Sequence, residues 1–358
     1  MKKLRVGVLG ATGMVGQQFI RLLENHPWFD VSIVAASPAS AGKTYKQAVS
    51  NKWKIDGEIP QSVNHLIVQA VENDMEHIVK EVDFVFSALG MEKEDIKRIE
   101  ESYAAAGIPV VSNNSAHRWS QDVPMIMPEI NPSHAALIDT QRKNRGWEKG
   151  LIAVKPNCSI QSYVSILTAL QMFVPQKVHV VSMQAISGAG KTFSDWTEMG
   201  DNVIPYIGGE EEKSEKEPLK IWGKIEQGHL RLADTPEIAA TCVRVPVSNG
   251  HMAAVSVMFE KKPSREEIIA AVRNFDNPLN DLALPSAPQM LIQYFDEQDR
   301  PQTKLDRDFE NGMGISMGRL EKDRQFDWKF ISLSHNTIRG AAGGAVLLAE
   351  LLVKKGYI

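Results

Sequence analysis

Cys158 is the side chain in this sequence that could act as a nucleophile. It follows a Lys-Pro-Asn turn and precedes an apolar segment, about 159–173, whose pattern predicts a helix. The dipole of a helix start favours the thiolate of a nearby cysteine, and a thiolate can form a thioester. Cys242, the other cysteine, lies in the alternating segment TCVRVPV and is typical of a small buried hydrophobe. We therefore predict that Cys158 is reactive and that Cys242 is not.

Two further polar side chains could serve such a thiol. Arg244 lies in an apolar strand, where an unpaired guanidinium would be unfavourable. It needs an anion, either a structural carboxylate or the carboxylate of a substrate, which it could bind bidentately. His251 follows a Ser-Asn-Gly turn just after that strand and could act as general acid and base. A single histidine is more often a surface residue, and spacing alone leaves open whether these side chains meet Cys158.

Glycines near the N-terminus predict a nucleotide site. Gly10, Gly13 and Gly16 follow an apolar run and precede a segment with helical spacing, QQFIRLLENH. Glycine allows a tight turn and a close approach of the backbone to a pyrophosphate, and the start of the helix offers amide donors. A glycine pattern alone is often only a turn, but the strand before it and the helix after it favour the nucleotide.

The segment after the second predicted strand, AASPASAGK, indicates which nucleotide binds. NAD enzymes usually carry Asp or Glu here for the ribose 2′-hydroxyl. This segment has no acid, whereas Ser37 and Ser40 offer hydroxyls and Lys43 offers a cation, which suit a 2′-phosphate. The alternative is a surface loop rich in small residues. We predict NADP rather than NAD as the cofactor.

The order of predicted elements indicates an α/β fold with two domains. Apolar runs alternate with helical segments in the first part of the chain, which predicts a doubly wound, Rossmann-like parallel sheet. From about residue 151 the runs alternate with period two, which predicts a large sheet with one buried face. We predict an NADP-binding domain at 1–157, completed by a C-terminal helix at 341–358, and a mixed α/β catalytic and dimerisation domain at 158–340. A large sheet with one open face also predicts a homo-oligomer, a dimer or a tetramer.

Composition excludes several classes of protein. The chain has 358 residues, 43% hydrophobic and 23% charged, which is typical of a globular protein too long for a single core. Its net charge of -4, with both signs spread along the chain, argues against a nucleic-acid partner. It has neither an apolar run that could span a membrane nor a signal peptide. Its 2 cysteines indicate a reducing, cytoplasmic location, and the absence of a His/Cys cluster at ligand spacing predicts no metal.

Taken together, the motifs resemble those of aspartate-semialdehyde dehydrogenases of the archaeal and fungal type. The resemblance runs nearly from end to end and is highly specific as a set, although each motif alone is not. The motifs are GATGMVG at 10–16, SNNSAHR at 112–118, PNCS at 156–159, QAISGAG at 184–190, DNVIPYIGGEEEK at 201–213, RVPVSNGH at 244–251 and NTIRGAAGG at 336–344.

The resemblance implies a role for individual residues of these motifs. The implied catalytic residues are Cys158 as nucleophile, Asn157 at the oxyanion, Gln184 beside the thioacyl group and His251 as acid and base. The implied substrate ligands are Arg244 for the α-carboxylate, Glu210 for the amino group, and Arg118 and Lys213 for the phosphate. The implied cofactor ligands are Gly10, Thr12, Gly13, Met14, Val15, Gly16, Ser37, Ser40, Lys43, Ser187, Gly188, Gly190 and Asn336. Without the resemblance, Glu210 and Lys213 in the run EEEKSEKEP would be interpreted as a solvated helix face.

The reaction implied by the resemblance is the NADPH-dependent reductive dephosphorylation of 4-phospho-L-aspartate to L-aspartate 4-semialdehyde. This step belongs to the biosynthesis of lysine, methionine and threonine. Archaeal malonyl-CoA and succinyl-CoA reductases are similar in sequence but carry Leu where this chain has Asn157. N-acetylglutamyl-phosphate reductase matches less well, and a non-catalytic NADP-binding sensor would need a broken site. The sequence departs from the family pattern at 191–196, where many relatives read Tyr-Pro-Gly-Val-Pro-Ser and this chain reads KTFSDW.

Overall fold

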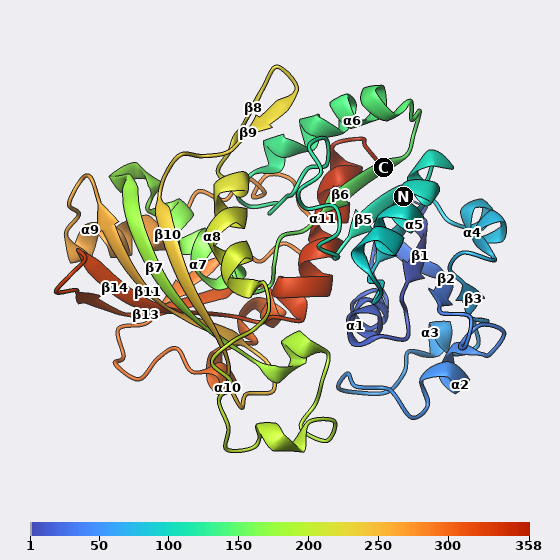
Figure 1. Cartoon of the computed structure of the whole chain (residues 1–358), viewed down its shortest axis with the longest axis horizontal. Helices are drawn as coiled ribbons and strands as arrows, with labels where there is room; N and C mark the ends of the chain where they lie inside the picture. Colours follow the sequence, from blue (N-terminus) through green and yellow to red (C-terminus); the bar gives the residue numbers. More distant parts are fainter. Residues whose placement is uncertain (1) are drawn as a thin grey trace.

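Two β-sheets organise the chain, each with its own helices (Figure 1). The computed structural model describes residues 2–358. The first sheet has 6 strands in the order β3-β2-β1-β4-β5-β6, and every pair is parallel. Its strands are β1 (Leu4–Leu9), β2 (Phe29–Ala36), β3 (Gln69–Ala70), β4 (Phe84–Ser87), β5 (Pro109–Ser112) and β6 (Leu151–Val154). Strands β4 to β6 are buried along their whole length, as expected for parallel strands covered on both faces.

Helices cover both faces of this sheet. They are α1 (Met14–Leu22), α2 (Tyr45–Val49), α3 (Gln61–Asn64), α4 (Met75–Glu81), α5 (Lys93–Ala105) and α6 (Leu137–Arg145). The C-terminal helix α11 (Gly343–Lys354) returns to the first sheet and shares its core: Val346 and Leu347 belong to the same buried cluster as Phe19 and Val111. The chain thus ends beside the domain in which it began.

The glycine turn lies where the strand order of the first sheet reverses, between β1 and β4. In parallel sheets this is the crevice where ligands bind. Gly10 has φ +85°, and a Cβ at this position would lie 2.3 Å from the carbonyl oxygen of Ala88. Only glycine fits there, because any side chain would collide with the backbone that follows β4.

The second sheet is mixed, with 6 strands in the order β10-β7-β11-β14-β13-β12. The strands are β7 (Pro175–Gln184), β10 (Glu237–Arg244), β11 (His251–Phe259), β12 (Ile292–Tyr294), β13 (Ile315–Lys322) and β14 (Trp328–Ser334). The pairs β7·β10 and β12·β13 are parallel and the others antiparallel. Along β11 every second residue is buried and those between are half-buried, so one face is covered and the other more open.

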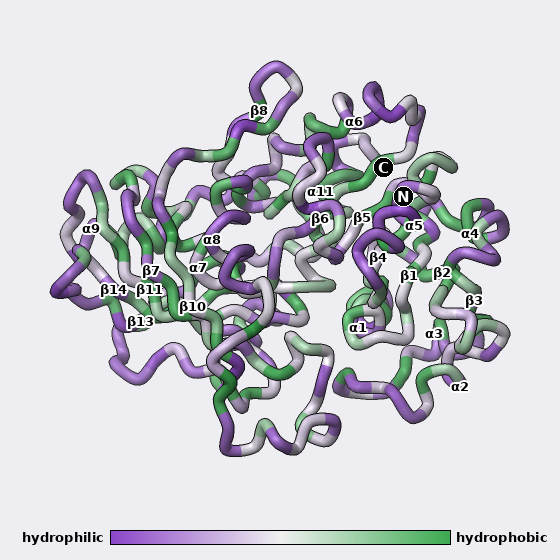
Figure 2. The backbone as a smooth tube through the Cα atoms, viewed as in Figure 1, coloured by the Kyte–Doolittle hydropathy of each residue, from purple (hydrophilic) through white to green (hydrophobic). Residues whose placement is uncertain are grey.

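The covered face of the second sheet packs against helices. These are α7 (Gln161–Ala169), α8 (Glu210–Ile221) and α9 (Arg265–Arg273). The short helix α10 (Thr303–Asp306) precedes β13, and the carbonyl of Asp306 accepts a hydrogen bond from the Ser316 hydroxyl. Helix α9 begins with a capping box in which Ser264 and Glu267 satisfy each other's backbone amides. A short hairpin of β8 (Lys224–Glu226) and β9 (His229–Arg231) projects from this half and is hydrophilic along most of its length (Figure 2).

The predicted α/β fold, with a parallel first sheet and a mixed second one, is confirmed. Some details differ from the sequence-based expectation. The helix expected at 159–173 is α7, followed by a separate turn of 3-10 helix at Gln171–Phe173, and the C-terminal helix begins at Gly343 after a π turn at Ile338–Ala342. We propose the boundaries predicted above, 1–157 with 341–358 and 158–340, which keep each sheet within one domain.

Candidate active site

Cys158 and His251 meet at the junction of the two domains. Cys158 lies in the segment between β6 and α7, and His251 is the first residue of β11. The sulfur of Cys158 is 3.5 Å from Nε2 of His251. The histidine is fully buried, whereas the cysteine is partly accessible. A thiol beside an imidazole, open to a ligand on one side, is the arrangement that covalent catalysis requires.

The imidazole of His251 is held in one orientation. Its Nδ1 accepts a hydrogen bond from the backbone N–H of Ala185, 3.0 Å away. Since Nδ1 is an acceptor, the proton of the neutral ring lies on Nε2 and points at the sulfur of Cys158. Burial, reinforced by the nearby Arg244, lowers the pKa of His251 to about 3. The neutral, Nε2-protonated form is therefore the state present at neutral pH.

The environment of the Cys158 thiol differs from the sequence-based expectation. Cys158 precedes the first turn of α7, which begins at Gln161, so it does not occupy the helix start itself. Burial raises the pKa of the Cys158 thiol, and the carboxylate of Glu210 raises it further. Lys155, Arg118 and Arg244 act in the opposite direction. Stabilisation of the thiolate thus depends on neighbouring cations and on the His251 N–H rather than on the dipole of α7.

Arg244 lies at the end of β10, beside the turn that carries Gly188. Its Nη1 donates to the carbonyl oxygen of Ala185 at 2.7 Å. Among residues 2–358, no carboxylate lies within ion-pair distance of this guanidinium, although the side chain is buried. A Cβ on Gly188 would lie 2.8 Å from Nη1 of Arg244 and 3.1 Å from Nε2 of His251. Glycine at 188 therefore allows the arginine and the histidine to share one side of the site.

Glu210 joins the residues predicted from the PNCS and QAISGAG motifs. Its carboxylate accepts from the Asn157 amide at 3.1 Å and from the Gln184 amide at 3.2 Å, and it pairs with Lys213 at 2.7 Å. Burial alone would raise the pKa of Glu210, but Lys213 and the two amides lower it, so the group is a carboxylate. The side chain of Asn157 also accepts from the amide and hydroxyl of Ser159.

Arg118 is paired with a buried carboxylate that sequence reasoning missed. Its Nη1 lies 2.9 Å from Oε1 of Glu217, and its Nε donates to the carbonyl of Lys155. The other oxygen of Glu217 accepts from the backbone N–H of Asn157 at 2.6 Å. Glu217 therefore ties the arginine to the segment that carries Cys158.

One face of helix α8 explains both buried carboxylates. Glu210, Ser214, Glu217 and Ile221 are all buried and recur at i, i+4, i+7 and i+11. Glu212 and Lys216, on the opposite side, are exposed and pair with each other at 2.8 Å. The interpretation of this charge run as a wholly solvated face is therefore wrong. In the sequence, the helical spacing of Glu210, Ser214 and Glu217 was the signal that could have indicated this buried face.

The glycine turn opens into a cavity of 330 Å³, lined by Gly10, Thr12, Gly13, Ser37, Gly90 and their neighbours. A Cβ on Gly13 would meet only the Gly10 carbonyl, at 3.6 Å, so the turn leaves room for a ligand. Gly13 is the N-cap residue of α1 and has no side chain that could bond to the first amides of the helix. Of the other predicted nucleotide residues, Ser40 is buried, and Lys43 is exposed and donates to the carbonyl of Ala39. Ser37 alone of the three lines the cavity.

A second cavity, of 460 Å³, lies between the domains. Met14, Ser187, Asn249 and Thr337 are among its lining residues. The Ser187 hydroxyl accepts from Asn336, whose own amide oxygen accepts from the backbone N–H of Gly250. The predicted cofactor residues of the first and second domains thus meet around one interdomain space.

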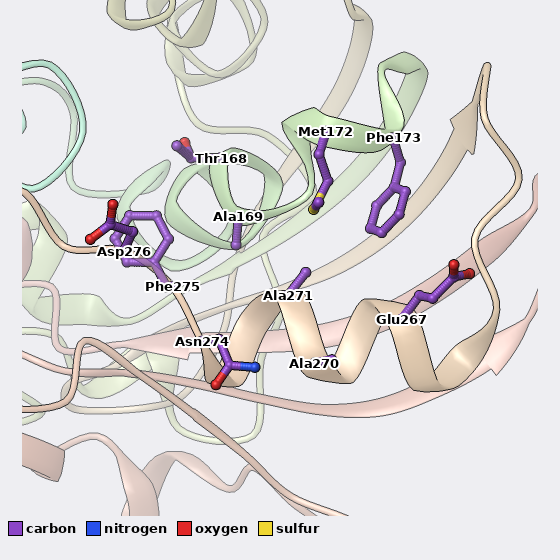
Figure 3. A pocket seen from close by; sticks show the side chains of 10 residues that line it. All are labelled: Thr168, Ala169, Met172, Phe173, Glu267, Ala270, Ala271, Asn274, Phe275 and Asp276. Carbon is purple, nitrogen blue, oxygen red and sulfur yellow. The ribbon is translucent and has the colours of Figure 1, made fainter.

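A hollow of 630 Å³ lies elsewhere, between the end of α7 and helix α9 (Figure 3). Met172 and Phe173 line it on one side and Ala271 and Asn274 on the other. It contains none of the predicted site residues, and we assign it no role in the chemistry.

Comparison with known proteins identifies the family. Residues 5–138 match the model described as semialdehyde dehydrogenase, NAD binding domain, and residues 167–339 match semialdehyde dehydrogenase, dimerisation domain. An aspartate-semialdehyde dehydrogenase from Archaeoglobus fulgidus is 46% identical over 99% of both chains. One from Saccharomyces cerevisiae is 40% identical over 98% of both. This chain belongs to the aspartate-semialdehyde dehydrogenase family. A crystal structure of the Candida albicans enzyme with NADP superimposes with a TM-score of 0.88, at 37% identity and 100% coverage of both chains.

A further residue of this family member that the sequence did not single out is Lys155. Its ammonium is buried and donates to the carbonyl oxygens of Pro156 and Gly340. Burial lowers the pKa of Lys155 to about 7. Because it bridges the segment before Cys158 to the π turn before α11, it holds together two parts of the site that are far apart in sequence.

Two negative findings concern residues 2–358. No group of three or more His, Cys, Asp or Glu side chains within that range could hold a metal ion. No helix in the same range is long and apolar enough to cross a membrane.

Proposed function

We propose that this protein reduces 4-phospho-L-aspartate to L-aspartate 4-semialdehyde with NADPH, through a thioester on Cys158. The observation that carries the proposal is the 3.5 Å approach of His251 Nε2 to the sulfur of Cys158, beside a buried Arg244 that has no carboxylate partner among residues 2–358. A nucleophile, a hydrogen-bond donor and a carboxylate-binding cation are thereby combined in one site.

The covalent step follows from the site. The Cys158 thiol first loses its proton to solvent. The resulting thiolate attacks the acyl carbon, the bond from that carbon to the phosphate oxygen breaks, and phosphate leaves with the electron pair. His251 donates its Nε2–H to the thiolate before attack and is free to donate to the developing oxyanion once sulfur loses its charge. This donor role fits the geometry better than proton abstraction, because the Ala185 amide occupies Nδ1. Transition-state donors of this kind are typically worth ~2.7–4 kcal/mol.

The substrate is recognised by charge. We propose that Arg244 binds its α-carboxylate and Glu210 its amino group. The phosphate would be bound by Lys213, which pairs with Glu210 in this structure, and by Arg118, which pairs with Glu217. Both cations therefore already have a carboxylate partner. A phosphate that binds here would have to rearrange the Lys213–Glu210 pair, the Arg118–Glu217 pair or both.

The residues present fit an NADP cofactor. The glycine turn leaves open space in front of the start of α1, and the hydroxyl of Ser37 lines the same cavity. Strand β2 ends without an acid, and Glu72, which also lines this cavity, is paired with Arg98. We propose that Gly10 to Gly16 bind the pyrophosphate and that Ser37, Ser40 and Lys43 bind the 2′-phosphate. The turn Ser187 to Gly190 would also line the cofactor phosphates, and Asn336 would face the nicotinamide carboxamide. NADPH, when bound there, supplies the hydride that reduces the thioester.

The alternatives considered from the sequence are not favoured. The curated relatives that span the chain are aspartate-semialdehyde dehydrogenases rather than CoA reductases. A non-catalytic sensor would need no aligned pair of Cys158 and His251. A biosynthetic role of this kind fits a cytoplasmic location, which cell fractionation tests.

A substrate panel tests the activity. We expect purified protein to reduce NADP in the presence of aspartate semialdehyde and phosphate, with little activity when either is omitted. Succinyl-CoA and malonyl-CoA with NADPH should give no turnover. Oxidation of NADPH by a CoA thioester, without phosphate-dependent oxidation of the semialdehyde, would overturn the assignment.

We also propose that the chain is a homodimer or a dimer of dimers. The second family model is named for dimerisation, and the open face of the second sheet carries half-buried apolar side chains, including Met252 and Ala254 of β11. Light scattering on the purified protein gives the mass directly. A monomer at micromolar concentration would contradict the proposal.

A further inference from the structure

Lys54 crosses from the first domain to the second. It lies between α2 and α3, in a segment that extends toward the loop after residue 190 (Figure 1). Its Nζ is 2.9 Å from Oδ2 of Asp195 and 3.0 Å from the carbonyl oxygen of Gly190. It also lines the 460 Å³ interdomain cavity together with Met14 and Ser187. One side chain therefore joins the two walls of the cavity.

The backbone of Lys54 is anchored to the glycine turn by Gln17 of α1. The buried Gln17 amide donates to the carbonyls of Thr12 and Lys52, at 2.9 and 2.8 Å. Its oxygen accepts from the backbone N–H of Lys54 at 2.8 Å. All three of these hydrogen bonds lie between α1, the glycine turn and the segment 52–54. Gln17 thus links the glycine turn to the segment that carries Lys54.

On the other side, Lys54 contacts the end of the turn that shapes the active site. Gly190 closes the 3-10 turn Ile186–Ala189. The residue before this turn, Ala185, orients His251 through its N–H and Arg244 through its carbonyl. Asp195 is itself fixed by the backbone N–H and hydroxyl of Thr192. The partner of Lys54 is therefore an ordered loop connected directly to the catalytic turn.

We propose that Lys54 is a positioning residue that couples occupancy of the glycine turn to the alignment of the His251 and Arg244 turn. The inference rests on the proposed function, because it takes the glycine turn as the nucleotide site. Asp195 lies in the 191–196 loop, where this sequence departs from the family pattern. Its contact with Lys54 gives this loop a role in the coupling.

The test compares Lys54→Met with Lys52→Met. Both replacements remove one lysine from the same short segment, but the structure records no side-chain partner for Lys52, which is exposed. Nucleotide affinity is measured by quenching of tryptophan fluorescence with NADPH alone, and kcat and KM are measured with the semialdehyde. We expect Lys54→Met to raise the Kd for NADPH by roughly three- to tenfold, since it loses a part-exposed ion pair and a charge-assisted hydrogen bond. It should also lower kcat at saturating NADPH, whereas Lys52→Met should change each by less than about twofold.

Two additional variants separate coupling from simple stability. Asp195→Asn should give a smaller loss than Lys54→Met, because Gly190 still accepts from the lysine. Adding Asp195→Asn to Lys54→Met should cause no further loss. A Lys54→Met protein with unchanged Kd and kcat, or one whose only change is a lower melting temperature, would overturn the proposal. Equal losses in Lys52→Met would do the same, because they would indicate a general effect of charge. If the wild type lacks activity on the semialdehyde, the proposed function fails while the NADPH titration still decides the role of Lys54.

Discussion

Replacement of Arg244 by leucine separates substrate recognition from folding. The guanidinium makes one hydrogen bond, to the Ala185 carbonyl, and no ion pair with any carboxylate among residues 2–358, yet only 6% of the residue is exposed. Burial accordingly lowers the pKa of Arg244. In the protein without substrate, the Arg244 guanidinium is removed from water and has no carboxylate beside it. Arg244→Leu should therefore leave the melting temperature nearly unchanged or raise it.

The same replacement should impair catalysis strongly. A buried charge pair with the substrate carboxylate is worth ~2–5 kcal/mol, which at ~1.4 kcal/mol per decade predicts a loss in kcat/KM of roughly 30- to 4,000-fold. Arg244→Lys should recover only part of this loss, because an ammonium cannot form the bidentate contact. Steady-state kinetics with the semialdehyde and thermal melting of both variants are the assays. A large drop in melting temperature with normal kinetics in the folded fraction would refute the reasoning and assign Arg244 to a structural contact.

Three other predictions concern the thiol, the cofactor and the histidine. Cys158→Ser should abolish turnover without loss of NADPH binding, and Cys242→Ser should be nearly silent; equal losses would remove the basis for choosing Cys158. Lys43→Glu should weaken NADPH about fivefold more than NADH in a titration, since only the 2′-phosphate repels the new charge; equal effects would make the loop structural. His251 has its pKa lowered from 6.5 to about 3, so the unfolded chain binds an extra proton between these values and the free energy of unfolding should fall as pH drops below about 6.5. His251→Gln should reduce that slope in urea titrations at pH 7 and 5, and an unchanged slope would show that other groups dominate.

Local patterns in the sequence predicted the framework of the fold. Gly10 follows a strand and precedes a helix, which predicted the glycine turn. The alternation around Cys242 and Arg244 is that of a half-buried strand. Each of these predictions needed only the neighbouring residues in the sequence. The position of Cys158 relative to α7 was less accurate, because the ends of helices depend on packing and capping. Here the helix begins at Gln161, and the thiol environment is set by side chains distant in sequence.

The contacts that assemble the site could not be obtained in this way. Glu217 reaches the backbone of Asn157 across 60 positions, and Lys54 reaches Gly190 across 136. Neither pair has a local signature, because charged residues on a helix or loop usually face solvent. Only the i, i+4, i+7 spacing of Glu210, Ser214 and Glu217 in α8 indicated that part of this charged run is buried.

The central claim is that a thioester forms on Cys158, and the mass of the peptide that contains this residue tests it most directly. The protein is incubated with aspartate semialdehyde and NADP in the absence of phosphate, quenched in acid and digested for peptide mapping. We predict the addition of one aspartyl group to the peptide that contains Cys158, its release when phosphate is added before the quench, and its absence from Cys158→Ser. Turnover without any adduct, or an adduct on a peptide lacking Cys158, would contradict the mechanism.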